Sequence, residues 1–300
     1  MLEFKKLTLE TIPEVAPYLT LHPQRLCDWT IGGTYIWRDA FKYEYAFAAG
    51  NLIFRMRIFD DECAFTVPLG GDREEGMRLI DEFCASCKHN GELQYAIAGE
   101  ADLPVLESHY AGMDICEERD YFDYLYEAKE LLELKGKIHR STRNNISRFN
   151  RFYPYNSFRI IDEEIIPDLH AFLDSYVEND TEADAATLEE ASKIHEVLDN
   201  MDLYRAFGAA LYAEDDVIVG FSLGEYDGDT LYVHVEKANT NYRGAYQVLM
   251  TSFVREFTNE NIIYVNREDD AGDPGLRKSK LSYNPVWLVK KYTVKNLVAK

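Results

Sequence analysis

Charged residues gather directly after the apolar segment Ile262–Val265. Charge is costly in a protein core and useful in a binding site, so this cluster at the end of a predicted buried strand indicates a cleft for a charged or polar ligand. A turn is predicted next at Pro274-Gly275, followed by a short basic segment. The candidate residues for binding a substrate or a phosphate are Asn266, Arg267, Glu268, Asp269, Arg277 and Lys280.

The segment Thr230–Lys237 is predicted to be a strand with one polar face. Alternation places Tyr232, His234 and Glu236 on this face and the apolar residues between them on the other. A carboxylate or imidazole that points into a cleft can act as a general base, so Glu236 and His234 are candidate catalytic residues. The same pattern is also ordinary for a half-exposed strand.

A helix is predicted from Gly244 to Phe257, with apolar residues at the spacing of a buried face. It opens on Arg243-Gly244-Ala245, and the first turn of a helix offers free N–H groups and a positive dipole end to a phosphate. Gly244 would let the backbone approach such a ligand closely. The alternative is a helix that simply begins at a glycine.

Another helix is predicted in the basic segment between Lys135 and Arg151, which contains no acidic residue. Its basic face is expected to meet solvent or an anion, and Arg140, Arg143 and Asn144 are its candidate binding residues. The alternative is a solvated face that balances an acidic protein. The apolar side, expected to dock on the protein, holds Ile138, Ile146, Phe149 and Phe152.

The composition limits the possible classes of protein. With 300 residues, 46% of them hydrophobic, the chain is expected to be globular with two domains. A net charge of −21 argues against broad contact with nucleic acid or anionic lipid. Because no apolar run is long enough to span a membrane and the cysteines are scattered, we expect a cytoplasmic protein. No metal site is predicted, since Cys84-x-x-Cys87 stands alone and residues 267–273 lack calcium-loop spacing.

Two halves with similar element orders are predicted, 1–127 and 128–300, with a charged linker at 127–135. Each half is expected to contain a mixed central sheet flanked by helices, which is an α+β fold. In the first half we expect strands at 43–48, 51–56, 64–67, 93–98 and 121–126 and helices at 12–26, 75–88 and 100–109. In the second we expect an antiparallel meander over 206–237, a closing strand over 286–294, and helices at 167–177 and 188–204.

Four spaced segments resemble a bacterial family of unknown function (DUF2156) that is related to the C-terminal domain of phosphatidylglycerol lysyltransferases. These segments are residues 134–149, 234–239, 242–247 and 264–280. The resemblance implies two tandem GNAT-like (acyl-CoA N-acyltransferase) domains, the arrangement of the Fem-type peptidyltransferases. The first half shows no phosphate-loop signature, so we expect it to wall the cleft and the second half to bind the donor.

The resemblance implies roles for particular residues as well. Glu236 matches the base that takes a proton from the attacking amine, and Tyr283 matches the acid that protonates the leaving group. Asn241 and Tyr246 depart from the family's signature for the loop that binds coenzyme A or acyl-coenzyme A. The residues implied to bind that cofactor are Val235, Lys237, Asn241, Tyr242, Arg243, Gly244, Ala245, Tyr246 and Gln247.

The expected function is transfer of an acyl or aminoacyl group to a small-molecule amine, with a coenzyme A thioester favoured as donor. One alternative is an aminoacyl-tRNA donor, whose phosphates would face Arg277, Lys280 and the basic helix. Another is a binding protein that has kept the fold and lost the chemistry, as the departures at Asn241 and Tyr246 permit. Lipid is not the expected acceptor, because the sequence has no counterpart of the lysyltransferases' membrane domain.

Overall fold

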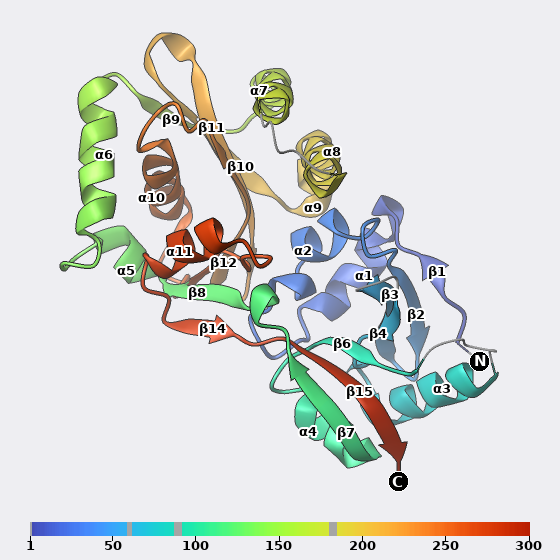
Figure 1. Cartoon of the computed structure of the whole chain (residues 1–300). Helices are drawn as coiled ribbons and strands as arrows, with labels where there is room; N and C mark the ends of the chain where they lie inside the picture. Colours follow the sequence, from blue (N-terminus) through green and yellow to red (C-terminus); the bar gives the residue numbers. More distant parts are fainter. Residues whose placement is uncertain (1, 59–61, 87–91, 180–184) are drawn as a thin grey trace. The chain divides into compact units, whose positions relative to one another are not determined.

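The computed structural model of the chain describes residues 2–58, 62–86, 92–179 and 185–300 (Figure 1). Contacts divide the chain into two compact units. Unit 1 comprises Met1–Asp123 and Val289–Lys300, and unit 2 comprises Tyr124–Leu288. Unit 2 is therefore inserted in the sequence of unit 1. The boundary predicted after residue 127 falls a few residues beyond the first division, and the C-terminal segment contacts unit 1.

Unit 1 contains a mixed sheet with the strand order β1-β2-β3-β4-β6-β15-β7, and β5 pairs with β3. The pair β4–β6 is parallel, with Phe65 opposite Tyr95, whereas β15 is antiparallel to both of its neighbours. The strands are β1 (Lys5–Lys6), β2 (Glu44–Ala48), β3 (Asn51–Ile58), β4 (Glu62–Phe65), β5 (Leu69–Gly70), β6 (Tyr95–Ala98), β7 (Tyr110–Glu117) and β15 (Tyr292–Ala299). The helices are α1 (Ile12–Leu19), α2 (Ile31–Ile36), α3 (Arg73–Ser86) and α4 (Leu103–His109).

Helix α3 shows how the sequence builds unit 1. Glu74 and Glu75 lie in its first turn, where negative charge is favourable near the positive end of the helix dipole. Met77 and Ile80 are buried in one hydrophobic cluster with Phe65 of β4 and Tyr95 of β6. The helix therefore connects two parallel strands and packs its apolar side on their sheet.

Unit 2 contains a sheet with the strand order β14-β8-β13-β12-β11-β10-β9. The consecutive strands β9 to β12 are antiparallel, so the predicted meander is confirmed. The strands are β8 (Asp123–Glu127), β9 (Ser157–Ile160), β10 (Phe207–Tyr212), β11 (Ile218–Asp227), β12 (Thr230–Ala238), β13 (Tyr264–Asn266) and β14 (Trp287–Val289). The helices are α5 (Ala128–Glu133), α6 (Arg140–Phe152), α7 (Ile166–Glu178), α8 (Ala185–Asp199), α9 (Met201–Tyr204), α10 (Ala245–Phe257) and α11 (Pro274–Leu281).

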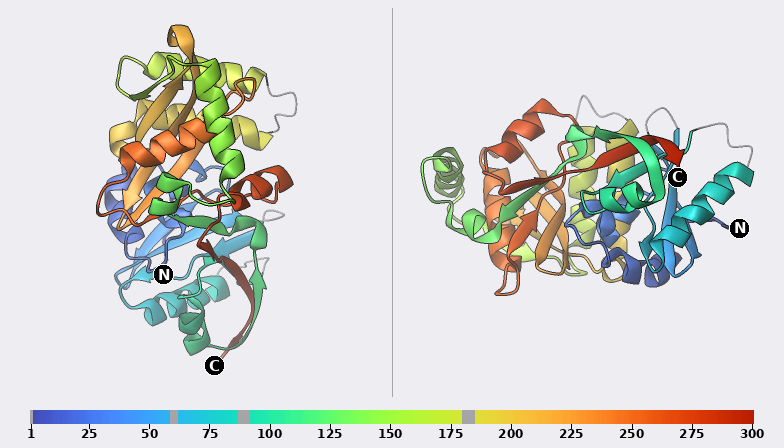
Figure 2. Two further views of the ribbon diagram at one scale, coloured as in Figure 1. Left: turned by 90° about the vertical axis from the view of Figure 1, so that its left-hand side faces the viewer. Right: turned by 90° about the horizontal axis from the view of Figure 1, so that it is seen from below.

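Helices cover both faces of the unit 2 sheet. On one face α10 buries Leu249 and Phe253, and α6 lies beside α10 with Phe149 in the same cluster as Leu249 (Figure 2). On the other face Phe172 of α7 meets Phe221 of β11 edge-on, with ring centroids 5.9 Å apart. The sheet is thus the middle layer, with α6 and α10 on one face and α7 and α8 on the other (Figure 1).

Some sequence expectations differ from the structure. Helix α1 ends at Leu19, not at residue 26, and the expected closing strand is two strands, β14 and β15. The expected turn at Pro274-Gly275 is instead the start of α11. Asp273 is the N-cap of this helix, since its side chain accepts a hydrogen bond from the backbone of Leu276, and proline is favoured in a first helical turn.

Candidate active site

The central feature of unit 2 is a split between its two parallel strands. Strands β12 and β13 pair only where residues 230–232 lie opposite residues 264–266. Beyond this point β13 ends at Asn266, while β12 continues to Ala238. Residues 233–238 of β12 therefore have no ladder partner on the β13 side among the residues that the structure describes. In open α/β sheets, ligands bind preferentially in such a gap at the carboxyl ends of strands.

A β-bulge at His234 changes which side chains face the split. Leu223 lies opposite Val235, but the next residue of β11, Gly224, lies opposite Val233, so His234 is the extra residue. Directly opposed residues share a face. The expectation that His234 and Glu236 share one face is wrong, because the bulge reverses the alternation after it.

The carboxylate of Glu236 is held by a buried arginine. Arg267 Nη2 lies 3.0 Å from both carboxylate oxygens, and the Arg267 side chain is 9% exposed. Although burial lowers the pKa of Arg267, the carboxylate raises it above its ordinary value. The other guanidinium nitrogen, Nη1, is buried without a hydrogen-bond partner, and so is Ser222 Oγ, whose residue lies opposite Glu236 in the ladder. The described residues thus leave two polar groups unsatisfied beside one carboxylate, which indicates a place for a polar ligand.

Tyr283 belongs to the same group of side chains. The Arg267 guanidinium lies 4.8 Å from the centre of the Tyr283 ring. Burial raises the pKa of Tyr283 to about 12, with Arg267 opposing and Glu236 adding to the shift. The phenol is therefore protonated at neutral pH and available as a proton donor. Gln247 of α10 hydrogen-bonds with it, which places one residue of the predicted coenzyme A loop next to the predicted acid.

His234, on the opposite face, lies between two carboxylates. Its Nδ1 is 2.7 Å from Glu268 Oε1, and its Nε2 is 2.9 Å from Glu225 Oε1. Burial lowers the pKa of His234, but the two hydrogen-bonded carboxylates raise it to about 10. A doubly bonded imidazolium has no lone pair for a substrate amine, so this arrangement favours a positioning role for His234 over a direct catalytic one.

The loop after β13 is fixed by its own charges. Arg277 binds Asp270 through two nitrogens, at 3.0 and 2.6 Å, and Tyr124 donates a 2.6 Å hydrogen bond to the same carboxylate. Lys280 donates to the backbone oxygens of Arg267, at 2.6 Å, and of Asp269, and burial lowers its pKa. The predicted phosphate-binding charges of Arg277 and Lys280 are thus engaged inside the loop, and a phosphate would have to replace these partners.

The predicted coenzyme A loop wraps the start of α10. Gly244 has φ +100, and a Cβ there would lie 2.4 Å from the backbone oxygen of Asn145 in α6. The close approach that requires glycine is therefore made by α6. Arg243 beside it is exposed. Tyr246 OH lies 3.2 Å from Tyr176 OH of α7, so the two helix layers meet beyond the end of β12.

A cavity of about 910 Å³ opens between α7 and the segment after β12. Asn241 and Tyr242 of the predicted loop line it, together with Tyr176 and the acids Asp168 and Asp216. Its described lining contains no lysine or arginine, although Arg159 pairs with Asp216 at its edge, so it is a better environment for an amine or a neutral polar group than for a phosphate.

The basic helix α6 docks on the protein with only part of its predicted apolar side. Phe149 is buried and Ile146 is partly buried, whereas Ile138 and Phe152, also expected on the docked side, are exposed. Arg140, Arg148 and Arg151 are exposed, and no carboxylate pairs with them in the part of the chain that the structure describes. Arg143 is exposed too and donates to the backbone oxygen of Leu134, and Asn144 lies beside it on the exposed side.

Sequence reasoning missed Ser222, Glu225 and Asp270. Glu225 carried a signal, because an acid within a strand predicted to be buried is unusual. Ser222 carried none, since its position opposite Glu236 depends on a bulge that alternation does not reveal.

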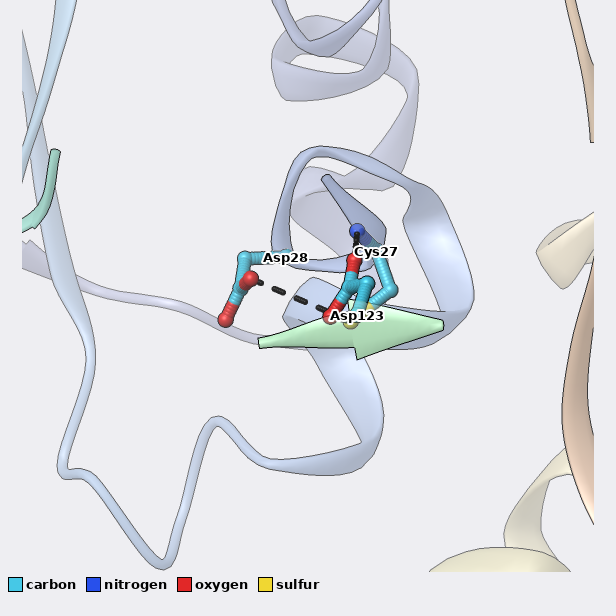
Figure 3. Close-up of side chains that lie close together, drawn as sticks. All are labelled: Cys27, Asp28 and Asp123. Carbon is cyan, nitrogen blue, oxygen red and sulfur yellow. Dashed lines mark hydrogen bonds between the residues drawn. The ribbon is translucent and has the colours of Figure 1, made fainter. Parts of the chain in front are cut away.

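Unit 1 holds a cluster of potential metal ligands, in which Cys27, Asp28 and Asp123 offer ligand atoms within 4.8 Å of one another (Figure 3). Lys291 Nζ already lies 2.6 Å from an Asp28 oxygen and 2.8 Å from an Asp123 oxygen. The ammonium group neutralises these carboxylates, and a metal ion would have to displace it.

None of the helices in the described ranges is long and apolar enough to cross a membrane.

Comparison with known proteins gives consistent results. The family model "Phosphatidylglycerol lysyltransferase, C-terminal" matches residues 20–295. An uncharacterized protein of Mycoplasmoides gallisepticum is 29% identical over 174 residues, 58% of this chain and 56% of that relative, so the match spans little more than half its length.

Two solved structures show the fold. A conserved protein of unknown function from Bacteroides thetaiotaomicron is 28% identical and superposes with a TM-score of 0.88, covering 98% of this chain and 99% of that one. FemX is 12% identical, with a TM-score of 0.54 and coverage of 97% and 96%. The predicted α+β fold of tandem GNAT-like and Fem-type proteins is thereby confirmed.

Proposed function

Because this chain belongs to the family of phosphatidylglycerol lysyltransferase C-terminal domains, we propose that it transfers an acyl or aminoacyl group from an activated donor to an amine. The reaction would take place at the split between β12 and β13. The observation that carries this proposal is the Glu236–Arg267 pair with two unpartnered polar groups, Arg267 Nη1 and Ser222 Oγ, beside it.

These side chains have complementary roles in such a reaction. Glu236 takes a proton from the attacking amine, directly or through water, as the new C–N bond forms. Arg267 Nη1 and Ser222 Oγ donate to the carbonyl oxygen as negative charge develops on it. When the bond to the leaving sulfur or oxygen breaks, Tyr283 supplies the proton that this atom requires.

The cavity beside α7 is suited to the acceptor. An amine enters a binding site as an ammonium ion, which Asp168 attracts, while Asn179 and Asn239 offer amide oxygens as acceptors. Asp216 is already paired with Arg159. The cavity lies beside residues 239–242, directly after the end of β12, the strand that carries Glu236.

Glu236→Gln tests the transfer step. The amide keeps the size of the side chain and removes its basicity, so turnover should fall by a factor of about 10² to 10⁴ while donor affinity changes little. Glu190→Gln is the matched control, because Glu190 is a partly buried carboxylate paired with the neighbouring Lys237. Equal turnover in wild type and Glu236→Gln would remove the catalytic role.

For the donor we favour a coenzyme A thioester, with Arg243 beside the helix start as its phosphate partner. Coenzyme A and acetyl-coenzyme A should raise the melting temperature, and Arg243→Ala should abolish the rise. Arg255→Ala, which removes an exposed arginine from the last turn of the same helix, should not. No rise at millimolar ligand in the wild type would exclude this donor.

An aminoacyl-tRNA donor is the second candidate, favoured by Arg140, Arg148 and Arg151 of α6, which are exposed and pair with no carboxylate among the described residues. RNA held by these side chains should dissociate steeply as salt rises, and replacing Arg148 and Arg151 with Gln should reduce the slope of log K against log salt by about 1 to 2. A chain that binds neither donor would be a binding protein that has kept the fold without the chemistry.

A further inference from the structure

Helices α7 and α8 lie side by side in unit 2 (Figure 1) and bring two histidines together. The rings of His170 and His195 lie end to end in nearly the same plane, with centroids 4.9 Å apart and an interplanar angle of 18°. Their Nδ1 atoms are 2.6 Å apart. This contact lies outside the split between β12 and β13 and has no part in the proposed transfer.

The second nitrogen of each ring is fixed by an aspartate. His170 Nε2 lies 3.0 Å from Asp199 Oδ1, and His195 Nε2 lies 3.1 Å from Asp174 Oδ1. An ionised carboxylate only accepts hydrogen bonds, so each Nε2 must carry its proton. In the neutral rings both Nδ1 atoms then present lone pairs to each other, which is unfavourable unless a proton bridges them at this distance or a metal ion does so after they separate.

The sequence produces this arrangement through one spacing used twice. His170 and Asp174 are four residues apart on α7, and His195 and Asp199 are four residues apart on α8. Residues at this spacing lie on one side of a helix. Each helix thus presents one imidazole and one carboxylate to the other, and each carboxylate reaches the histidine across the interface.

The geometry points to a transition-metal site, in which His170 and His195 bind a Zn²⁺ ion through their Nδ1 atoms. Imidazole nitrogen is a preferred zinc ligand, and metal-bound histidines typically donate their other N–H to a carboxylate. With Zn–N distances of about 2.0 to 2.1 Å, an ion between the two nitrogens requires them to separate by about 1.5 Å. Both rings are partly exposed, so water or another ligand completes the coordination.

The ion would join α7 to α8. The opposite side of α7 lines the cavity proposed for the acceptor, through residues such as Asp168, Phe172 and Ser175. A metal ion at His170 and His195 therefore stabilises one wall of this cavity without contacting its contents.

The experiment is a Zn²⁺ titration of the chelator-treated full chain, by calorimetry and by thermal unfolding at pH 7.5. Zn²⁺ should raise the melting temperature, and His170→Gln and His195→Gln should each weaken the tightest binding step at least about 100-fold. Asp174→Asn should weaken it by about 10- to 100-fold through the loss of the outer hydrogen bond. His109→Gln is the matched control, since His109 also binds an aspartate, Asp81, but pairs with no histidine among the residues that the structure describes.

Nitrogen-15 resonances of the imidazoles provide a readout that needs no variant to fold. Zn²⁺ should shift the Nδ1 resonances of His170 and His195 and leave their Nε2 atoms protonated. Equal affinity in wild type and both histidine variants would overturn the proposal. So would a proton shared between the two Nδ1 atoms that excess Zn²⁺ does not displace.

Discussion

The buried His234 imidazolium should make the stability of unit 2 depend on pH. The pKa of His234 rises from 6.5 to about 10 between two carboxylates, Glu225 and Glu268. Because the folded pKa is the higher one, the stabilisation is fully present below pH 6.5 and is lost as the pH rises through 10. A shift of this size corresponds to about 5 kcal/mol of unfolding free energy, at about 1.4 kcal/mol per pH unit.

His234→Gln removes the proton that links these carboxylates. At pH 7 it should destabilise unit 2 by about 3 to 5 kcal/mol, since two largely buried carboxylates lose their counter-charge. The difference from wild type should shrink steadily between pH 7 and pH 10. Replacing Trp29 and Trp37 with Phe leaves Trp287 of unit 2 as the only tryptophan, whose fluorescence follows denaturant unfolding.

Two results would contradict this reasoning. One is an imidazole that titrates near pH 6.5 in the folded protein by nuclear magnetic resonance. The other is a stability difference between wild type and His234→Gln that stays constant from pH 7 to pH 10. As an internal check, Glu225→Gln keeps a hydrogen-bond acceptor beside the ring and removes one charge, so the loss of stability should move to lower pH.

Three further predictions concern other contacts in unit 2. Although burial opposes it, the hydrogen bonds and charge of Arg277 and other donors lower the pKa of Asp270 to about 2. About 2 kcal/mol of stability should therefore be present above pH 3.8 and lost as the pH falls through 2. Acid unfolding of Asp270→Asn should lack this step. Gly244→Ala should lower the unfolding free energy by about 1 to 3 kcal/mol, because residue 244 has φ +100 and the added Cβ would meet the backbone of Asn145. An unchanged denaturation midpoint would contradict the contact with α6. Ser222→Ala should raise the unfolding free energy by up to about 1 kcal/mol, because it removes an unsatisfied buried hydroxyl. It should also reduce turnover about tenfold or more if that hydroxyl stabilises the transition state, and unchanged turnover would remove Ser222 from the site.

Local patterns predicted much of unit 2, and non-local geometry accounts for the rest. The helix at 245–257 and the meander followed from apolar periodicity and turn residues, because both depend on neighbours in sequence. Strand β7 was not predicted, since its run Tyr110–Glu117 alternates weakly and is a strand through pairing with β15, far along the chain. Propensity cannot report a partner at that separation.

The candidate site shows the same limit. Glu236 and Arg267 were both identified by residue type, but their bond was not, because a bulge at His234 decides the face of Glu236. Gly244 was interpreted as space for a ligand, whereas the group that needs the space is the backbone of Asn145. A glycine in a sequence shows that room is needed without showing what occupies it.

The return of the chain to unit 1 affects how the protein can fold during synthesis. Strand β15 lies between β6 and β7, yet all of unit 2 is translated before it. The facing edges of β6 and β7 therefore remain open on the ribosome until residue 299 has been made, whereas unit 2 can complete its β8 to β13 core earlier. Open strand edges invite pairing with other chains, so we expect the incomplete first unit to be prone to aggregation during synthesis.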